Sequence, residues 1–121
     1  MTHQSMVAHT GVSNDMQLCI EVCQECHASC LETVMHCLSM GGPHATPAHI
    51  GLLLDCADAC RLSADFMLRG SPRHARSCTL CAEMCEACAA ECDRFEDEFM
   101  KACAMVCRRC AASCREMAAG H

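Results

Sequence analysis

The spacing of cysteines is the feature of this sequence that most limits how the chain can fold. From Cys78 to Cys92 the cysteines follow one another at intervals of three, four, three and four residues. Side chains at these intervals share one face of an α-helix, and neither Gly nor Pro interrupts the segment up to Lys101. The spacing therefore predicts a helix with a stripe of thiols. The other cysteines form similar stripes, at Cys19, Cys23, Cys26, Cys30 and Cys37, at Cys56 and Cys60, and at Cys103, Cys107, Cys110 and Cys114.

Four striped segments predict an all-α protein, an up-down antiparallel four-helix bundle with a cysteine-lined core. Gly41-Gly42-Pro43 is expected to end the first helix, and Gly70-Ser71-Pro72 to end the second and begin the third. Short connections of this kind let every stripe be buried against the others. The first three helices are expected over residues 15–39, 47–69 and 72–92.

The boundary between the third and fourth helices carries no Gly or Pro. Asp93 followed by Glu96 resembles a capping box, and Asp97 is a second possible cap. One long rod is the alternative, but four helices are preferred because they close a bundle. Residues 1–13 are expected to form a flexible N-terminal tail, and residues 14–121 a single Cys-rich bundle domain.

Sulfur replaces the usual core residues, since the chain has 16 Cys and 10 Met but only 3 Phe and neither Trp nor Tyr. Cysteines three or four apart on a helix have Cβ atoms about 5–6 Å apart, whereas a disulfide needs about 3.5–4.5 Å. Disulfides within a stripe are therefore not expected. Residues 1–15 contain no apolar run typical of a signal peptide, and no stretch is long enough for a membrane span. We expect a reduced, cytoplasmic protein without a membrane partner.

Net charge and aromatic content argue against a nucleic-acid partner. The charge is −6, so the surface offers no excess of cations for phosphates and few rings for bases.

Thiolates select Cu(I), Zn(II) or iron–sulfur clusters. Two cysteines at i, i+4 can lean together as a clamp for one Cu(I). About sixteen Cu(I) ions, roughly one per cysteine, would neutralise the thiolates, whereas zinc in four-cysteine sites would leave about half of their charge buried. The predicted cargo is therefore Cu(I). The clamps are Cys19/Cys23, Cys26/Cys30, Cys56/Cys60, Cys81/Cys85, Cys88/Cys92, Cys103/Cys107 and Cys110/Cys114, with Cys37 and Cys78 left over.

Two alternatives remain, a zinc-thiolate buffer and an iron–sulfur electron-transfer protein. The triplet Cys-x₃-Cys-x₂-Cys of radical enzymes that use S-adenosylmethionine begins at Cys19, Cys81 and Cys103. Any helical cysteine stripe of this period generates the triplet, and those enzymes need a barrel much larger than this chain.

Histidine and methionine are candidate ligands at the ends of the bundle, where their weaker binding of Cu(I) suits a mouth. His36, Met40 and Met100 are the candidates at the preferred end. Up-down topology also brings His44, His49 and Asp55 to that end. The other end is expected to gather Met16, Met67, His74, Met117 and His121.

The segments Leu54–Cys60, Phe66–Ser71, Cys78–Cys92 and Cys107–Cys114 resemble the cytosolic bacterial copper storage proteins. The resemblance implies a four-helix bundle, usually a homotetramer, in which the cysteines hold Cu(I) and no catalysis takes place. Family members often carry His-Cys just before the last stripe, where this chain has Phe99-Met100. Because this chain departs from the family pattern at these two positions, the family's ligands at the mouth do not carry over to it.

Overall fold

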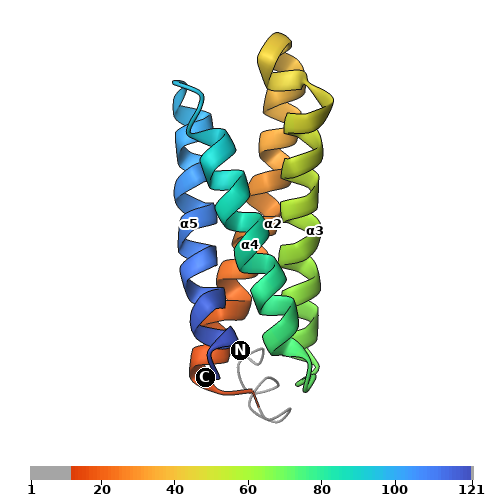
Figure 1. The fold of residues 1–121 in the computed structure, drawn as a ribbon, viewed down its shortest axis with the longest axis vertical. Helices are drawn as coiled ribbons and strands as arrows, with labels where there is room; N and C mark the ends of the chain where they lie inside the picture. The colour runs from red at the N-terminus through yellow and green to blue at the C-terminus, as the bar shows by residue number, and fades with distance from the viewer. Residues whose placement is uncertain (1–11, 121) are drawn as a thin grey trace, which may run out of the picture.

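A computed structural model describes residues 12–120, which form an antiparallel up-down bundle of four α-helices (Figure 1). Each helix packs against its neighbours in sequence, and α2 packs against α5 to close the ring. The predicted fold is confirmed. The elements are α2 (Asn14–Met40), the 3₁₀ helix η1 (Gly42–Ala45), α3 (Pro47–Leu68), α4 (His74–Cys92) and α5 (Glu98–Ala118).

The ends of α2 lie within one residue of the prediction. The Ser13 hydroxyl accepts a hydrogen bond from the Met16 amide at 3.1 Å, which caps the helix. Gly41 follows the last turn with a φ of 73°, and its amide donates to the Cys37 carbonyl. Of the predicted tail, Val12 is buried and Ser13 is the cap, so both belong to the bundle; residues 1–11 lie outside the described part of the chain.

Helix α3 begins as predicted, with Thr46 as its cap and Pro47 in its first turn. Helix α4 begins at His74, two residues later than expected. The Ser71 hydroxyl accepts from the Arg73 amide at 3.1 Å and stabilises a turn before the helix.

The chain turns between α4 and α5, so the alternative in which the third and fourth helices form one long rod is wrong. Helix α4 ends at Cys92, and α5 begins after Asp97, whose ψ of 151° is extended. Asp93 follows the last helical residue as the C-cap of α4, where its amide donates to the Ala89 carbonyl, so it does not begin the next helix as the predicted capping box required. Asp97 occupies the cap position, but its carboxylate binds other partners, which are described below.

The core lies along the bundle axis, where all sixteen cysteines are 0 or 1% exposed. Small buried residues such as Ala57 and Ala104 let the helices approach closely. A second apolar stripe on α2 is covered by the core only in part: Ile20 and Val34 are buried, whereas Leu31 and Leu38 are exposed.

Within residues 12–120, the helices are too short or too polar for any of them to traverse a lipid bilayer.

Candidate metal centre

The sixteen cysteine thiols are all free and buried. Contacts between their Sγ atoms measure 3.5 to 4.0 Å and mostly join different helices. These are non-bonded distances, well beyond the roughly 2.05 Å of a disulfide. The prediction of a thiol core without disulfides inside the stripes is confirmed.

Within the described residues, at least four groups of four cysteines place their Sγ atoms within 4.8 Å of one another. Each quartet combines helices that are distant in sequence, so the bundle itself assembles the donors. A group of three lies at the end of the series. The quartets are Cys23/Cys81/Cys110/Cys114, Cys26/Cys60/Cys85/Cys110, Cys26/Cys30/Cys56/Cys107 and Cys30/Cys88/Cys103/Cys107, and the trio is Cys19/Cys78/Cys114.

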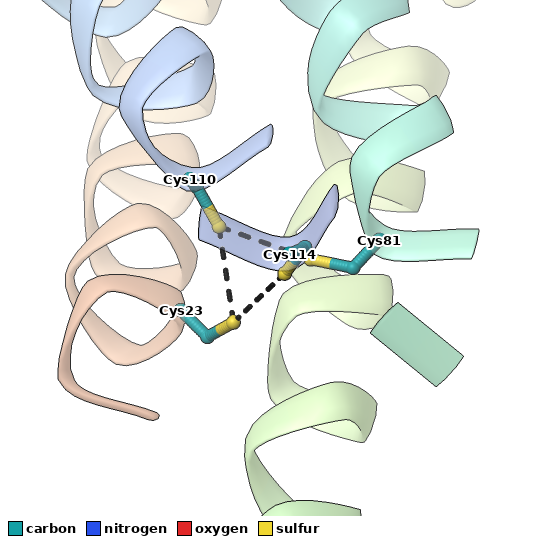
Figure 2. A group of neighbouring side chains, drawn as sticks. All are labelled: Cys23, Cys81, Cys110 and Cys114. Carbon is teal, nitrogen blue, oxygen red and sulfur yellow. Dashed lines mark hydrogen bonds between the residues drawn. The ribbon is translucent and has the colours of Figure 1, made fainter. Parts of the chain in front are cut away.

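The first quartet shows how the donors converge (Figure 2). Cys23 of α2 lies 3.5 Å from Cys114 and 3.8 Å from Cys110, both on α5. Cys81 of α4 lies 3.8 Å from Cys110. Three helices therefore supply one cluster of sulfurs, a size that suits a soft metal ion or a small group of them.

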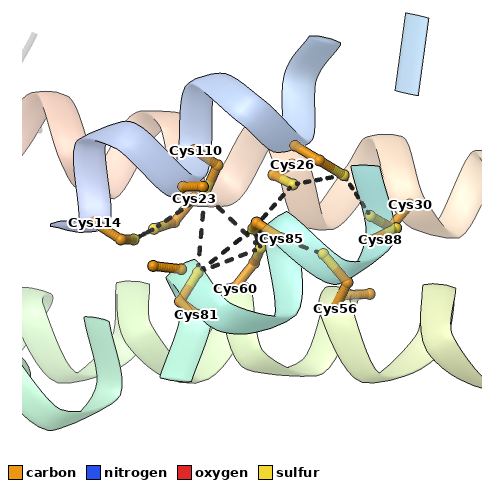
Figure 3. Packing of buried hydrophobic residues seen from close by; sticks show 14 of the residues in the cluster. Cys23, Cys26, Cys30, Cys56, Cys60, Cys81, Cys85, Cys88, Cys110 and Cys114 are labelled. Carbon is orange, nitrogen blue, oxygen red and sulfur yellow. Dashed lines mark hydrogen bonds between the residues drawn. The ribbon is translucent and has the colours of Figure 1, made fainter. Parts of the chain in front are cut away.

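Neighbouring groups share cysteines, so they form one continuous series, which we call the thiol ladder (Figure 3). Cys114 joins the trio to the first quartet, Cys110 joins the first to the second, and Cys26 joins the second to the third. Cys30 and Cys107 join the third to the fourth. A shared sulfur has lone pairs for two metal ions, and the ladder is therefore built for bridging thiolates.

Three of the i, i+4 clamps expected from the sequence, Cys26/Cys30, Cys103/Cys107 and Cys110/Cys114, lie within quartets that also take cysteines from other helices. Cys81 and Cys85 lie 4.0 Å apart along α4, but Cys85 is closer to Cys60 of α3, at 3.6 Å. The spacing in the sequence determines which helix face carries the cysteines, whereas the packing of the helices determines which sulfur atoms are nearest neighbours.

Contacts between thiols lower the pKa of some cysteines in the ladder and raise the pKa of others. Contacts with Cys107 and other thiols lower the pKa of Cys26, because neighbouring S–H groups donate to its thiolate. Contacts with Cys103 and other thiols, together with burial, raise the pKa of Cys30. Ionising one thiol in a quartet thus hinders ionisation of the next, and full deprotonation requires cations to balance the charge.

The upper end of the bundle in Figure 1, where α2 leads through η1 into α3 and α4 turns into α5, holds a different set of donors. The Sγ atom of Cys37 lies 3.2 Å from Nε2 of His49 and 3.5 Å from Sδ of Met100. All three side chains are at most 2% exposed. Nδ1 of His49 donates to the Glu91 carboxylate at 2.9 Å. Arg94 binds the same carboxylate.

His49 was expected at this end from up-down topology, but not as one of the ligands. The signal was present, since His49, Leu53, Cys56 and Cys60 lie on one helical stripe. The structure does not bring Met40 to the thiols, because its side chain is 53% exposed.

His36 lies at the rim rather than against the thiols. Its Nε2 is 2.9 Å from Oδ2 of Asp97, and Nε2 of His44 is 3.0 Å from Oδ1 of the same carboxylate. Phe99 stacks on His36 with ring centroids 4.2 Å apart, and Phe95 packs against His44. Asp55, expected at this end, is exposed and lines a groove on the outer face of α3 and α4.

The lower end, where α3 turns into α4, closes on Cys78. Its Sγ lies 3.8 Å from Sδ of Met67 and 3.2 Å from the Ser63 hydroxyl. Met117 is buried at this end, as expected from the sequence, while His121 lies outside the described residues.

Fold and site together define a class: a helical bundle whose core is lined with free thiols poised for soft metal ions. The chain belongs to the copper storage protein family, because the model of that family, described as copper storage protein, matches residues 12–119.

Relatives agree with this assignment. An uncharacterized cysteine-rich protein, YhjQ, from Bacillus subtilis (strain 168) is 39% identical over 103 residues, which cover 85% of this chain and 95% of the relative. The Cu(I)-bound copper storage protein BsCsp3 superposes with a TM-score of 0.82 at 37% identity, over 87% of this chain and 99% of that one. The Nmul_A1745 protein from Nitrosospira multiformis gives a TM-score of 0.84 at 42% identity, over 88% and 97% of the two chains.

Proposed function

We propose that this protein stores and buffers Cu(I) in the cytoplasm, at about one ion per cysteine. Membership of the copper storage protein family supports the proposal, as does the similarity to a protein whose structure contains Cu(I). The role we propose is storage rather than catalysis, in keeping with the family description and with a core that offers ligands for the cargo.

The observation that carries the proposal is the sharing of cysteines between quartets. A sulfur that belongs to two quartets can bridge two Cu(I) ions, and a series of bridges balances each thiolate with one monovalent charge. Charge neutrality matters because every sulfur is buried, and unbalanced charge in a core is strongly destabilising.

Zinc storage fits the same arrangement less well. Structural Zn(II) sites are usually separate, each with four tetrahedral ligands, whereas neighbouring quartets here share Cys26 or Cys110. Each such zinc site would also retain two negative charges among buried sulfurs.

We place the mouth at the upper end, where His36 and His44 lie at the rim above Cys37. Weak imidazole ligands at a rim can pass an ion to stronger thiolates inside. Met40 is exposed on the same end of α2 and is a candidate for the first contact with a copper donor.

A homotetramer remains part of the proposal. Helix α2 exposes Leu31, Met35 and Leu38, at 40, 66 and 50% of their surfaces, and an apolar face of this kind suits contact with another copy of the chain. Sedimentation equilibrium of the apo and loaded protein tests this part, and a monomer at micromolar concentration would contradict it.

The central test is an anaerobic titration of the fully reduced protein with Cu(I) against a chromogenic chelator, beside a parallel titration with Zn(II). We expect about one tightly bound Cu(I) per cysteine and a nearly constant helical circular dichroism signal, because the apo bundle already places the donors. Saturation at about four metal ions with a preference for zinc would replace the proposal with a zinc-thiolate buffer. Acid-labile sulfide in the purified protein would favour an iron–sulfur protein.

A further inference from the structure

We infer that Cys37, His49 and Met100 form a separate site for a single Cu(I) ion at the upper end of the bundle, with Glu91 as the residue that positions His49. This inference rests on the proposed function, and adds to it a site with one thiolate, one imidazole and one thioether in place of shared thiolates.

The positions of protons already indicate a metal site. The Glu91 carboxylate accepts from Nδ1 of His49 at 2.9 Å, so Nδ1 carries the hydrogen and the lone pair of Nε2 points at Cys37, 3.2 Å away. Met100 directs its Sδ at the same thiol from 3.5 Å. The single S–H proton of Cys37 therefore lies between two acceptors.

Replacing that proton with a metal ion leaves the Cys37 thiolate with two further donors, Nε2 of His49 at 3.2 Å and Sδ of Met100 at 3.5 Å. With metal–nitrogen and metal–sulfur bonds of about 2.0 and 2.3 Å, trigonal ligands stand about 3.8 Å apart. The imidazole and the thioether need to move outward by about half an ångström or less. Each of these side chains has free torsions for such a shift, and neither requires the helices to separate.

Charge and burial decide which ion fits. The Cys37 thiolate balances one positive charge, while neutral His49 and Met100 add none, and the Glu91 carboxylate is already paired with Arg94. A divalent ion would leave one positive charge in a place where the three donors are at most 2% exposed. Zn(II) also needs a fourth ligand, whereas Cu(I) accepts soft ligands in low coordination.

A carboxylate behind the ligating histidine is the usual means of fixing its tautomer and strengthening the ligand. Glu91 lies at the end of α4 and meets His49 from the first turn of α3. The α4 helix thus positions a ligand that α3 supplies, for a thiol that α2 supplies.

The direct experiment follows the imidazole nitrogens. Reduced protein labelled with ¹⁵N-histidine is titrated anaerobically with Cu(I), at constant pH, up to saturation. We expect the Nε2 resonance of His49 to shift on binding while its Nδ1 remains protonated. Cu(I) bound by the cysteines without any change at His49 up to saturation would overturn the site and leave the storage proposal intact. Absence of tight Cu(I) binding would overturn both.

Methionine variants provide a second measurement on α5. Met100→Leu preserves the volume of a buried side chain, and Met105→Leu is its matched control, because Met105 is 67% exposed on the same helix. We expect the most easily released Cu(I) ion to dissociate about tenfold faster from Met100→Leu than from Met105→Leu. Identical release curves for the two variants would contradict a role for Met100 as a ligand.

Glu91→Leu tests the positioning role. Loss of the carboxylate is expected to mix the two His49 tautomers in the apo protein and to weaken the upper ion about tenfold. A His49 that keeps its proton on Nδ1 in this variant would show that Glu91 has only a structural role.

Discussion

The two ends of the bundle are built on the same plan with one exchanged group. At the upper end, Cys37 contacts Sδ of Met100 and Nε2 of His49; at the lower end, Cys78 contacts Sδ of Met67 and the hydroxyl of Ser63. The imidazole and the hydroxyl lie at the same distance from their thiols, 3.2 Å.

The exchange of an imidazole for a hydroxyl makes the two ends behave differently only when a metal ion is present. In the apo protein both groups are ordinary hydrogen-bond partners for a thiol. Toward Cu(I), however, an imidazole nitrogen is a ligand, and a neutral hydroxyl is a poor one. The comparison indicates that the ends are equivalent in folding and different in copper exchange.

If the two ends are equivalent in folding, Cys37 and Cys78 should contribute equally to the stability of the apo protein at alkaline pH. The loss of stability as the pH rises is the largest effect we expect. Burial, followed by the charges of Asp97 and nearby thiols, raises the pKa of Cys37 to about 11. Cys114 lowers the pKa of Cys78, but Cys19 and burial outweigh this contact and raise it to about 11 as well.

A raised thiol pKa favours folding fully below the unfolded value of 9.0, and the contribution is lost as pH rises through about 11. The loss is at most about 3 kcal/mol for each of these thiols. Urea unfolding at pH 7, 9 and 10.5 measures it, with Cys37→Ala and Cys78→Ala as variants. Both substitutions should flatten the decline equally, and a difference between them would break the equivalence of the two ends.

Most of the fold could be predicted from the sequence because helical periodicity and helix ends are local properties. The stripe from Cys78 to Cys92 determines which face of α4 is buried, and the ends of the first two helices lie within a residue of those expected, 15–39 and 47–69. The start of α4 was two residues off, since Ser71 stabilises a turn instead of the helix.

Partners across the core could not be predicted, because they depend on the rotation and relative height of the helices. The spacing showed that Cys81 and Cys85 share a face but not that Cys85 meets Cys60. For the same reason His49 was placed at the correct end without its contact to Cys37, and Met40 was included although it points outward.

Copper uptake should show the difference between the ends. We expect His49→Gln to slow the transfer of Cu(I) from a chromogenic chelator about tenfold, equivalent to about 1.4 kcal/mol in the barrier. Ser63→Ala, the matched change at the lower end, should alter the rate less than twofold. Stopped-flow absorbance measures both, and equal rates would mean that the imidazole has no part in uptake.

The rim of the upper end should contribute to stability more weakly. Burial alone would raise the pKa of Asp97, but hydrogen bonds from His44 and His36 outweigh it and lower the pKa. Asp97→Asn removes the charge and one acceptor, so we expect a loss of about 1–2 kcal/mol at pH 7.

The pH dependence has a definite sign, because a lowered carboxyl pKa favours folding above the unfolded value of 3.8 and the contribution disappears as pH falls through the folded value. The difference between Asp97→Asn and wild type should therefore vanish in acid. Asp93→Asn is the control, because Asp93 pairs with exposed Arg108 and this substitution should change stability by less than about 0.5 kcal/mol. An equal loss of stability in the two variants would show that Asp97 has no special role.

Met67→Leu should have the smallest effect and is the strictest test of the comparison. Leu has a similar volume, so the apo bundle should lose less than about 1.5 kcal/mol. Cys78 also belongs to the trio with Cys19 and Cys114, and two further thiolates make the thioether dispensable for holding an ion there. We therefore expect the number of bound Cu(I) ions and their release to a chelator to match wild type, unlike Met100→Leu. If Met67→Leu accelerates release to the same extent, then the thioether contact, which both ends share, determines release, and the exchange of histidine for serine does not distinguish the two ends.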